Sequence, residues 1–157
     1  MNILEKESIN PSTLGLLIYI KLNSSGNEYI QDLIKKYCFD FETESGEKPV
    51  DILEKADLVK YTKTGSKTRP WENLRLSDKG SKILKEMYEK PQHPLTEYMY
   101  DYTRKEYERI GAEKTYIQGG GKLMNYISEF LYSKNSYNER MIRAVITAYV
   151  NQFDYEK

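Results

Sequence analysis

The sequence holds very little of the chemistry that builds disulfide, metal or redox sites. It contains one Cys, Cys38, and one His, His93, among 157 residues. A single cysteine excludes an internal disulfide and suits a reducing compartment. One Cys and one His also cannot supply the ligands of a Cys/His zinc site within one chain. We therefore expect no metal and no cofactor.

Long apolar runs are also missing. No stretch of the sequence is long and apolar enough for a transmembrane helix. The N-terminal residues, MNILEKESINPS, lack the basic start and apolar core of a secretory signal. Hydrophobic residues make up 39% of the chain and charged residues 31%, which is typical of a soluble globular protein. We expect a cytoplasmic protein with no membrane partner.

Motifs that carry catalysis are absent from the sequence too. It has no nucleophile elbow, zinc-binding helix or dinucleotide fingerprint. The triple glycine in residues 116–122 (YIQGGGK) invites comparison with a phosphate-binding loop. That loop would need Gly at Tyr116 and Ser or Thr at Leu123, and both positions differ. We interpret residues 116–122 as a hinge or a loop before a helix, and we expect a non-enzyme.

The sequence has no net charge overall, but its charges are unevenly distributed. It carries 24 basic and 24 acidic side chains, which is unlike a nucleic-acid coat protein. Residues 39–57 hold seven acids and two lysines, a net charge of −5. Residues 60–85 hold eight bases and two acids, a net charge of +6. These blocks indicate either two binding surfaces of opposite sign or two solvated surfaces that partly neutralise each other.

The most informative pattern lies between Ile52 and Leu84. It predicts the end of a helix, a strand from Leu58 to Tyr61, a polar loop over residues 62–70 and a second strand over residues 71–76. Ser77 then stands where the N-cap of a following helix is expected. The segments "LEKADLV" (53–59) and "LRLSDKG" (74–80) carry this pattern.

This order resembles the wing of winged-helix transcription regulators of the MarR and PadR type. In those families "LEKxGLV" closes the recognition helix, and "LRLSDKG" or "YRLTEKG" enters the next helix. The resemblance covers roughly residues 10–88. It implies a mainly α fold with a small antiparallel β-hairpin, in which a winged helix-turn-helix domain (residues 1–90) is followed by a helical C-terminal extension (residues 91–157).

Apolar periodicity supplies the remaining helices. We expect an apolar, buried helix that begins at Asn10 and runs to about Leu22, and a third helix over residues 49–57. Pro91 and Pro94 break the chain before the extension, and His93 between them is expected to be a loop residue. The remaining expectations are a second helix over residues 29–37, a helix over residues 95–110 that ends at Gly111, and a helical hairpin with stripes at 123–131 and 141–150 around a turn at 133–138.

Two functions remain open. The first is a DNA-binding protein, such as a small transcriptional regulator or replication accessory of bacterial or phage origin. It would bind double-stranded DNA and dimerise through its C-terminal helices. Because phosphates dominate nucleic-acid affinity, basic side chains on the wing and its neighbours are the expected contacts. These candidate DNA-binding residues are Lys48, Lys55, Lys60, Lys63, Lys67, Arg69, Arg75 and Lys79.

The second function is a protein-interaction module, such as an assembly, adaptor or inhibitor protein built on the same scaffold. The third helix favours this alternative, because a helix that reads base edges is expected to offer Arg, Lys, Asn or Gln. This helix offers mostly carboxylates instead. The candidate protein-binding residues are Asp51, Glu54 and Asp57. A Lys-rich hairpin tip is equally consistent with DNA contact and with the need to keep an exposed edge soluble.

Overall fold

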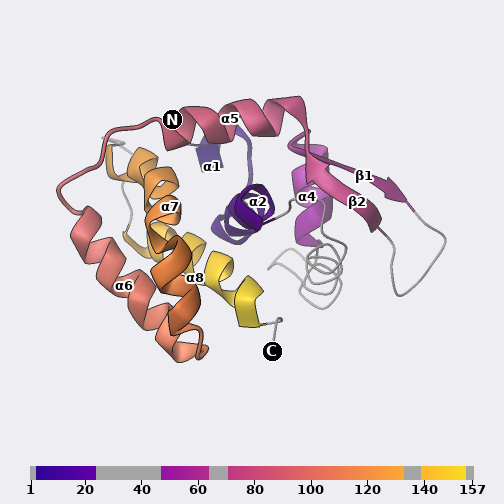
Figure 1. Cartoon of the computed structure of the whole chain (residues 1–157). Coiled ribbons are helices and arrows are strands. Elements are labelled where there is room, and N and C mark those ends of the chain that lie inside the picture. The colour runs from indigo at the N-terminus through magenta and orange to yellow at the C-terminus, as the bar shows by residue number, and fades with distance from the viewer. Residues whose placement is uncertain (1–2, 24–46, 64–70, 133–138, 155–157) are drawn as a thin grey trace.

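The structure is a computed structural model that describes residues 3–23, 47–63, 71–132 and 139–154 (Figure 1). The expected helix over residues 29–37, the turn over 133–138 and the hairpin tip lie outside these ranges. In chain order the described elements are α1 (Ile3–Lys6), α2 (Pro11–Asn23), α4 (Pro49–Lys55), β1 (Val59–Lys63), β2 (Trp71–Leu76), α5 (Asp78–Tyr88), α6 (Thr96–Arg109), α7 (Glu113–Tyr132) and α8 (Glu139–Asp154).

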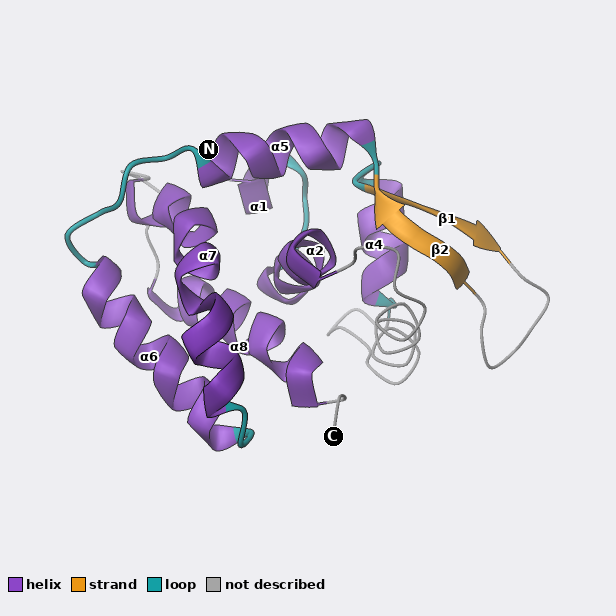
Figure 2. Ribbon diagram, in the orientation of Figure 1, coloured by secondary structure: helices purple, strands orange, loops and turns teal. Residues whose placement is uncertain are grey.

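The fold is mainly helical with one small antiparallel sheet, as the sequence predicts. Figure 2 shows the hairpin of β1 and β2 on one side of the molecule, beside α4, while α6 and α7 lie on the opposite side. α2 lies between these two groups, and α5 runs across them. In the described part of the chain no helix is both long and apolar enough to cross a membrane.

The expected buried helix is α2, and it forms the centre of the core. Every residue from Thr13 to Ile20 is buried. The helix begins with a reciprocal cap, in which the backbone N–H of Thr13 donates to Asn10 Oδ1 at 2.9 Å. The Thr13 hydroxyl in turn accepts from the Asn10 backbone N–H at 3.2 Å. This cap satisfies donors that the first turn of a helix leaves without partners.

α8 packs closely along α2, although the two helices lie at opposite ends of the described chain. Gly15 makes this approach possible, because a Cβ at that position would lie 2.6 Å from Ala148 Cβ and 2.8 Å from the Val145 carbonyl oxygen. Further along the contact, the rings of Tyr19 and Phe153 meet edge to face, with centroids 5.1 Å apart. Residues from both sides of the 91–94 connector therefore contribute to one hydrophobic core.

One expected loop is a helix instead. Residues 116–122 (YIQGGGK), interpreted from the sequence as a hinge, are part of the continuous helix α7. Each glycine in a helix interior costs about 1 kcal/mol relative to alanine, which is why the sequence favoured a break. α7 packs along α6 and also contacts α5, and this tertiary contact offsets the weak local propensity. Gly111, by contrast, follows α6 with φ +73°, so the predicted end of that helix is confirmed.

The connector between α5 and α6 is a loop, as Pro91 and Pro94 predict. His93 lies in this loop and accepts a hydrogen bond at Nδ1 from the Leu95 backbone N–H, at 3.1 Å. Its ring also meets that of Tyr132 edge to face, with centroids 4.9 Å apart. The predicted role of His93 as a loop residue is confirmed, and its contact with Tyr132 holds the connector against the end of α7.

Candidate nucleic-acid interface

The hairpin of β1 and β2 has one face toward the core and one toward solvent. Val59 pairs with Leu76 and Lys60 with Arg75, and the register shifts between Lys60 and Thr62. Val59 is buried and Leu76 half-buried, whereas Lys60 and Arg75 are exposed. Residues directly opposite each other in an antiparallel pair project from the same face. The outward face of the hairpin therefore carries two cations next to each other.

The base of the hairpin is fixed to α5 by residues 76–80, the "LSDKG" segment. The Ser77 hydroxyl accepts from the Gly80 backbone N–H at 2.9 Å, which caps α5 as predicted. The same hydroxyl donates to the Asp57 carbonyl oxygen at 2.5 Å. The Ser77 backbone N–H donates to the Leu58 carbonyl oxygen at 3.0 Å. One serine thus joins the end of α4, the start of β1 and the start of α5.

Lys79 strengthens the same junction. Its ammonium group donates to the Ala56 carbonyl oxygen at 3.0 Å and forms an ion pair with Glu7 at 2.8 Å. The Glu7 side chain is only 6% exposed, so this pair is shielded on one side from solvent. Lys79 is a candidate for DNA contact, but its ammonium group already bridges α5 to the residues that directly follow α4 and α1 through these two contacts.

The turn between α4 and β1 has unusual backbone geometry. Asp57 has φ +60°, a left-handed conformation that non-glycine residues adopt infrequently. This is the position at which the "LEKxGLV" pattern has glycine. The turn is closed by a hydrogen bond from the Leu58 backbone N–H to the Leu53 carbonyl oxygen, at 2.9 Å. The tight reversal directs the chain straight from α4 into β1.

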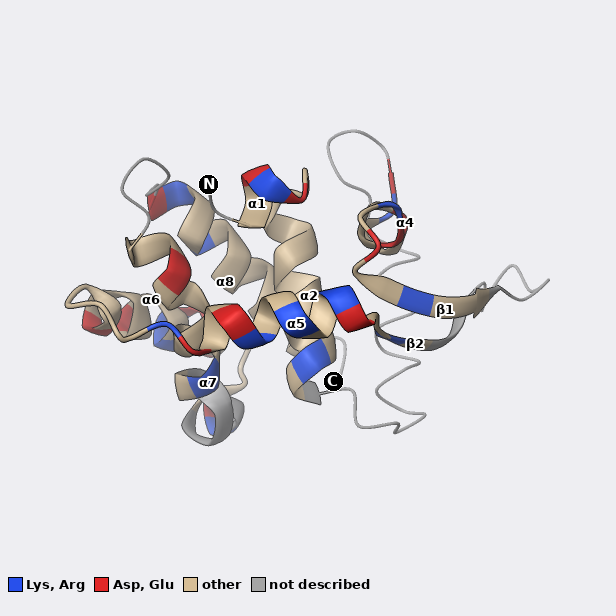
Figure 3. Ribbon diagram, turned by 90° about the horizontal axis from the view of Figure 1, so that it is seen from above, with Lys and Arg blue, Asp and Glu red and all other residues tan. Residues whose placement is uncertain are grey.

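α4 and the turn that follows it expose two carboxylates and one lysine. Leu53 is buried, whereas Glu54 and Asp57 are exposed and Asp51 is half-buried. Lys55 is exposed but pairs with Glu47 at 2.5 Å, and the Glu47 carboxylate raises the pKa of the Lys55 ammonium group. Lys48 is half-buried at the N-cap of α4. Figure 3 shows that acidic segments predominate on α4, whereas the neighbouring hairpin carries basic ones.

The candidate DNA-binding residues thus occupy different environments. Lys60 and Arg75 share the outer face of the hairpin, and Lys63 pairs with Trp71 at its far end. Lys48 and Lys55 belong to the acidic α4 region, and Lys79 lies in the junction at the base of α5. Lys67 and Arg69 lie outside the described residues. The structure therefore brings Lys60 and Arg75 together on one face of the hairpin.

The structure also contains a second basic region, which no single sequence motif predicts. Lys21 at the end of α2, Lys82 and Lys85 on α5, and Lys122 on α7 surround one cavity. The spacing of Lys82 and Lys85 is a sequence signal for a basic helix face. Nothing in the sequence brings Lys21 and Lys122 beside that face, because they come from distant segments.

Neither metal binding nor known relatives guide the interpretation further. Within the described ranges, no group of three or more His, Cys, Asp or Glu side chains could hold a metal ion. No family model, curated protein or solved structure matches the chain.

Proposed function

We propose that this protein is a winged-helix protein that binds double-stranded DNA, as a small regulator or replication accessory does. The observation that carries the proposal is the pair Lys60 and Arg75, exposed and directly opposite each other on the outer face of the hairpin. Like charges placed opposite each other repel. An anion lying over this face would be attracted by both side chains, so a phosphate of a DNA backbone fits here.

Two local features support the winged-helix part of the proposal. The helix–strand turn has a left-handed residue, Asp57, where the family pattern has glycine. The order of helix α4, antiparallel hairpin and capped helix α5 is also the order that the resemblance implies. The acidic surface of α4 makes deep insertion of this helix into the major groove unfavourable. We infer that the hairpin makes the main phosphate contacts.

The test compares charge removal on the hairpin with matched charge removal elsewhere. The double variant Lys60→Ala/Arg75→Ala should bind random-sequence duplex DNA more weakly and should lower the salt slope by about two contacts. The control is Lys105→Ala/Lys114→Ala, which removes two exposed cations from α6 and α7 on the far side of the molecule. This control variant should bind duplex DNA with the same affinity and salt slope as the unmodified protein.

The hairpin tip provides a second arm of the same test. Replacing Lys63, Lys67 and Arg69 with alanine should weaken binding to all sequences similarly and reduce the salt slope by up to about three contacts. Mobility-shift titrations at two salt concentrations measure both effects. Equal affinities and slopes for the hairpin and control variants would rule out the hairpin as the DNA contact.

An alternative function rests on α4. Glu54 on α4 and Asp57 in the turn that follows it are exposed, and the Glu54 carboxylate accepts a hydrogen bond from the Tyr61 hydroxyl at 3.2 Å. This acidic surface would suit a non-enzymatic module that docks onto a basic protein surface. Charge reversal on α4 separates the two functions, because it strengthens contact with DNA and weakens contact with a basic protein.

Dimerisation through the C-terminal helices remains part of the DNA-binding proposal. Leu95 and Tyr98, at the start of α6, are among its exposed large apolar side chains. Further along the helix, Arg104 pairs with Asp101 at 2.6 Å and with Glu108 at 2.7 Å. Because these charged side chains already pair within α6, a self-complementary contact between two copies would centre on Leu95 and Tyr98. Measurement of molecular mass in solution for the unmodified protein and for Leu95→Ser/Tyr98→Ser tests it.

A further inference from the structure

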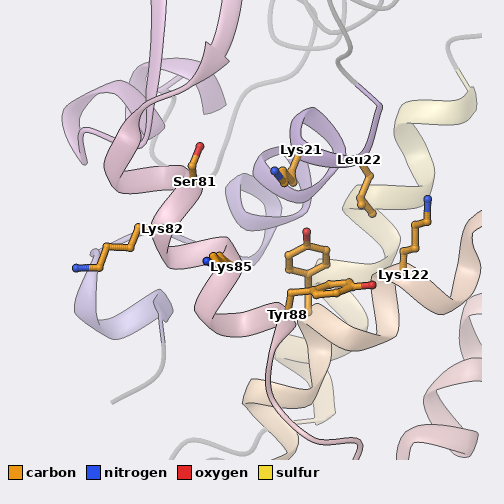
Figure 4. A pocket seen from close by; sticks show the side chains of 8 residues that line it. Lys21, Leu22, Ser81, Lys82, Lys85, Tyr88 and Lys122 are labelled. Carbon is orange, nitrogen blue, oxygen red and sulfur yellow. The ribbon is translucent and has the colours of Figure 1, made fainter.

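A cavity of about 550 Å³ opens between the end of α2, α5 and α7. We call it the lysine pocket, because Lys21, Lys82, Lys85 and Lys122 line it together with Tyr88 and Tyr126. Its volume lies within the range of small-molecule sites. Figure 4 shows Lys85 and Lys122 on opposite sides of the Tyr88 ring, whereas Lys82 extends away from that ring.

The described residues that line this pocket carry charge of one sign, because four of them are lysines and none is acidic. In the part of the chain that the structure describes, no ion pair engages any of the four lysines, although other surface lysines and arginines pair with neighbouring carboxylates. Four ammonium groups around one cavity repel one another, so an anion with several charges would stabilise the arrangement.

The aromatic side chains add a second requirement. The rings of Tyr88 and Tyr126 are tilted against each other, with centroids 5.2 Å apart. Tyr88 is 42% exposed, so part of its ring remains accessible. Burial, followed by the effect of neighbouring Tyr88, raises the pKa of Tyr126 above its ordinary value of 10.0. An exposed ring beside an apolar floor is a surface on which a flat ring stacks.

Helix periodicity explains why lysine and tyrosine occur together here. Lys85 and Tyr88 are three residues apart on α5, and Lys122 and Tyr126 are four apart on α7. At either spacing two side chains share one face of a helix. Because α5 and α7 pack against each other, each helix presents a Lys–Tyr pair at the same junction. Leu22 from α2 contributes the apolar floor.

We propose that the lysine pocket binds a nucleoside polyphosphate, with the base stacked on Tyr88 and the phosphates held by the surrounding lysines. This ligand class combines a flat aromatic ring with several negative charges. Inorganic phosphate would leave the ring unused, and an aromatic monocarboxylate would neutralise only one of the cations. The inference does not depend on DNA binding by the hairpin.

Titration calorimetry with the full chain tests the proposal, with adenosine triphosphate as the probe. Adenosine and inorganic tripolyphosphate are the comparators. Adenosine triphosphate should bind saturably and at least about tenfold more tightly than either comparator, because stacking and charge contacts each contribute about a factor of ten or more. Binding should also raise the midpoint of thermal unfolding, since the ligand bridges elements of the folded state.

Variants assign the binding to the pocket. Lys85→Ala and Lys122→Ala should each weaken binding by about tenfold, the value of one charge-assisted hydrogen bond. Lys82→Ala should weaken it less, because this side chain extends away from the ring. Tyr88→Ala should also weaken binding by about tenfold, whereas Tyr88→Phe should retain it, because the ring remains. Lys114→Ala, which removes an exposed cation at the start of α7, should have no effect.

Several results would overturn the proposal. The first is that tripolyphosphate binds as tightly as adenosine triphosphate. The second is that Lys85→Ala and Lys114→Ala lose the same amount of affinity for adenosine triphosphate. The absence of saturable binding at about millimolar ligand would have the same consequence. Duplex DNA that displaces the nucleotide, and whose own affinity falls in Lys85→Ala and Lys122→Ala, would assign the pocket to nucleic acid instead.

Discussion

A Cβ at Gly80 would lie 2.2 Å from the carbonyl oxygen of Leu58. This contact explains the glycine that ends the "LSDKG" segment, because the first turn of α5 lies directly against the corner between α4 and β1. The Leu58 carbonyl accepts the Ser77 backbone N–H at the same place, so it cannot move away without losing that bond. Glycine is needed here for close approach, with no positive φ involved.

We predict that Gly80→Ala destabilises the protein, whereas Gly121→Ala does not. The new methyl group at residue 80 must displace backbone, so the free energy of unfolding should fall by about 1–3 kcal/mol. At exposed Gly121, a Cβ would meet only the Tyr100 hydroxyl at 3.4 Å, an ordinary contact. That change should raise the free energy of unfolding by about 0.5–1 kcal/mol through helix propensity. Urea denaturation of both variants measures the contrast.

At the left-handed turn of Asp57 we predict that introducing a glycine stabilises the protein. Glycine adopts φ +60° without steric cost, so Asp57→Gly should raise the free energy of unfolding by up to about 1 kcal/mol. Asp57→Val should lower it, because a β-branched residue is poorly accommodated at positive φ. Both changes leave the carbonyl that accepts from Ser77 in place. A stabilising Asp57→Val would show that the turn adopts another conformation in solution.

The α6–α8 contact should depend on pH through Glu106. Burial raises the pKa of Glu106, but hydrogen bonds from Arg109, Thr147 and Tyr102 outweigh it and lower the pKa below the ordinary value of 4.5. A carboxyl with a lowered folded pKa stabilises the folded state above its unfolded pKa, and this stability is lost as pH falls through the folded pKa. Glu106→Gln should therefore cost about 1 kcal/mol at neutral pH, and the difference should shrink below about pH 4.5.

Glu108→Gln is the control for this prediction. Glu108 is an exposed carboxylate on the same helix, so its replacement should change the free energy of unfolding by less than about 0.5 kcal/mol. Urea denaturation at a series of pH values compares both variants with the unmodified protein. If the difference in free energy of unfolding between Glu106→Gln and the unmodified protein stayed constant down to about pH 3, Glu106 would not be the group whose pKa is lowered.

Charge reversal on α4 distinguishes the two proposed functions. If DNA is the ligand, Asp51→Lys/Glu54→Lys should strengthen non-specific binding, because repulsion is removed and phosphate partners are added. If α4 docks onto a basic protein surface, the same change should abolish that complex through like-charge contact, at a cost of several kcal/mol. Mobility shift and partner titration measure the two outcomes, and circular dichroism confirms that the variant folds.

The sequence predicts elements that are determined locally. Alternation of Leu74 and Leu76 with Arg75 is enough to predict β2, and Ser77 is enough to predict the start of α5. The continuity of α7 through its triple glycine was missed, because it depends on packing against α6. The lysine pocket was missed for a related reason. Its residues come from three helices, and no pattern within one helix reports which other helix will lie beside it.

The packing of α8 along α2 has a consequence for how the chain folds. During synthesis, α2 emerges long before α8, the helix that covers its Gly15 side. Until then, an almost wholly apolar helix lacks its main partner. The core is therefore completed only once α8 has been made, and contacts between such distant segments slow folding. A fragment that ends at residue 90 would expose this same side of α2 and would be prone to self-association.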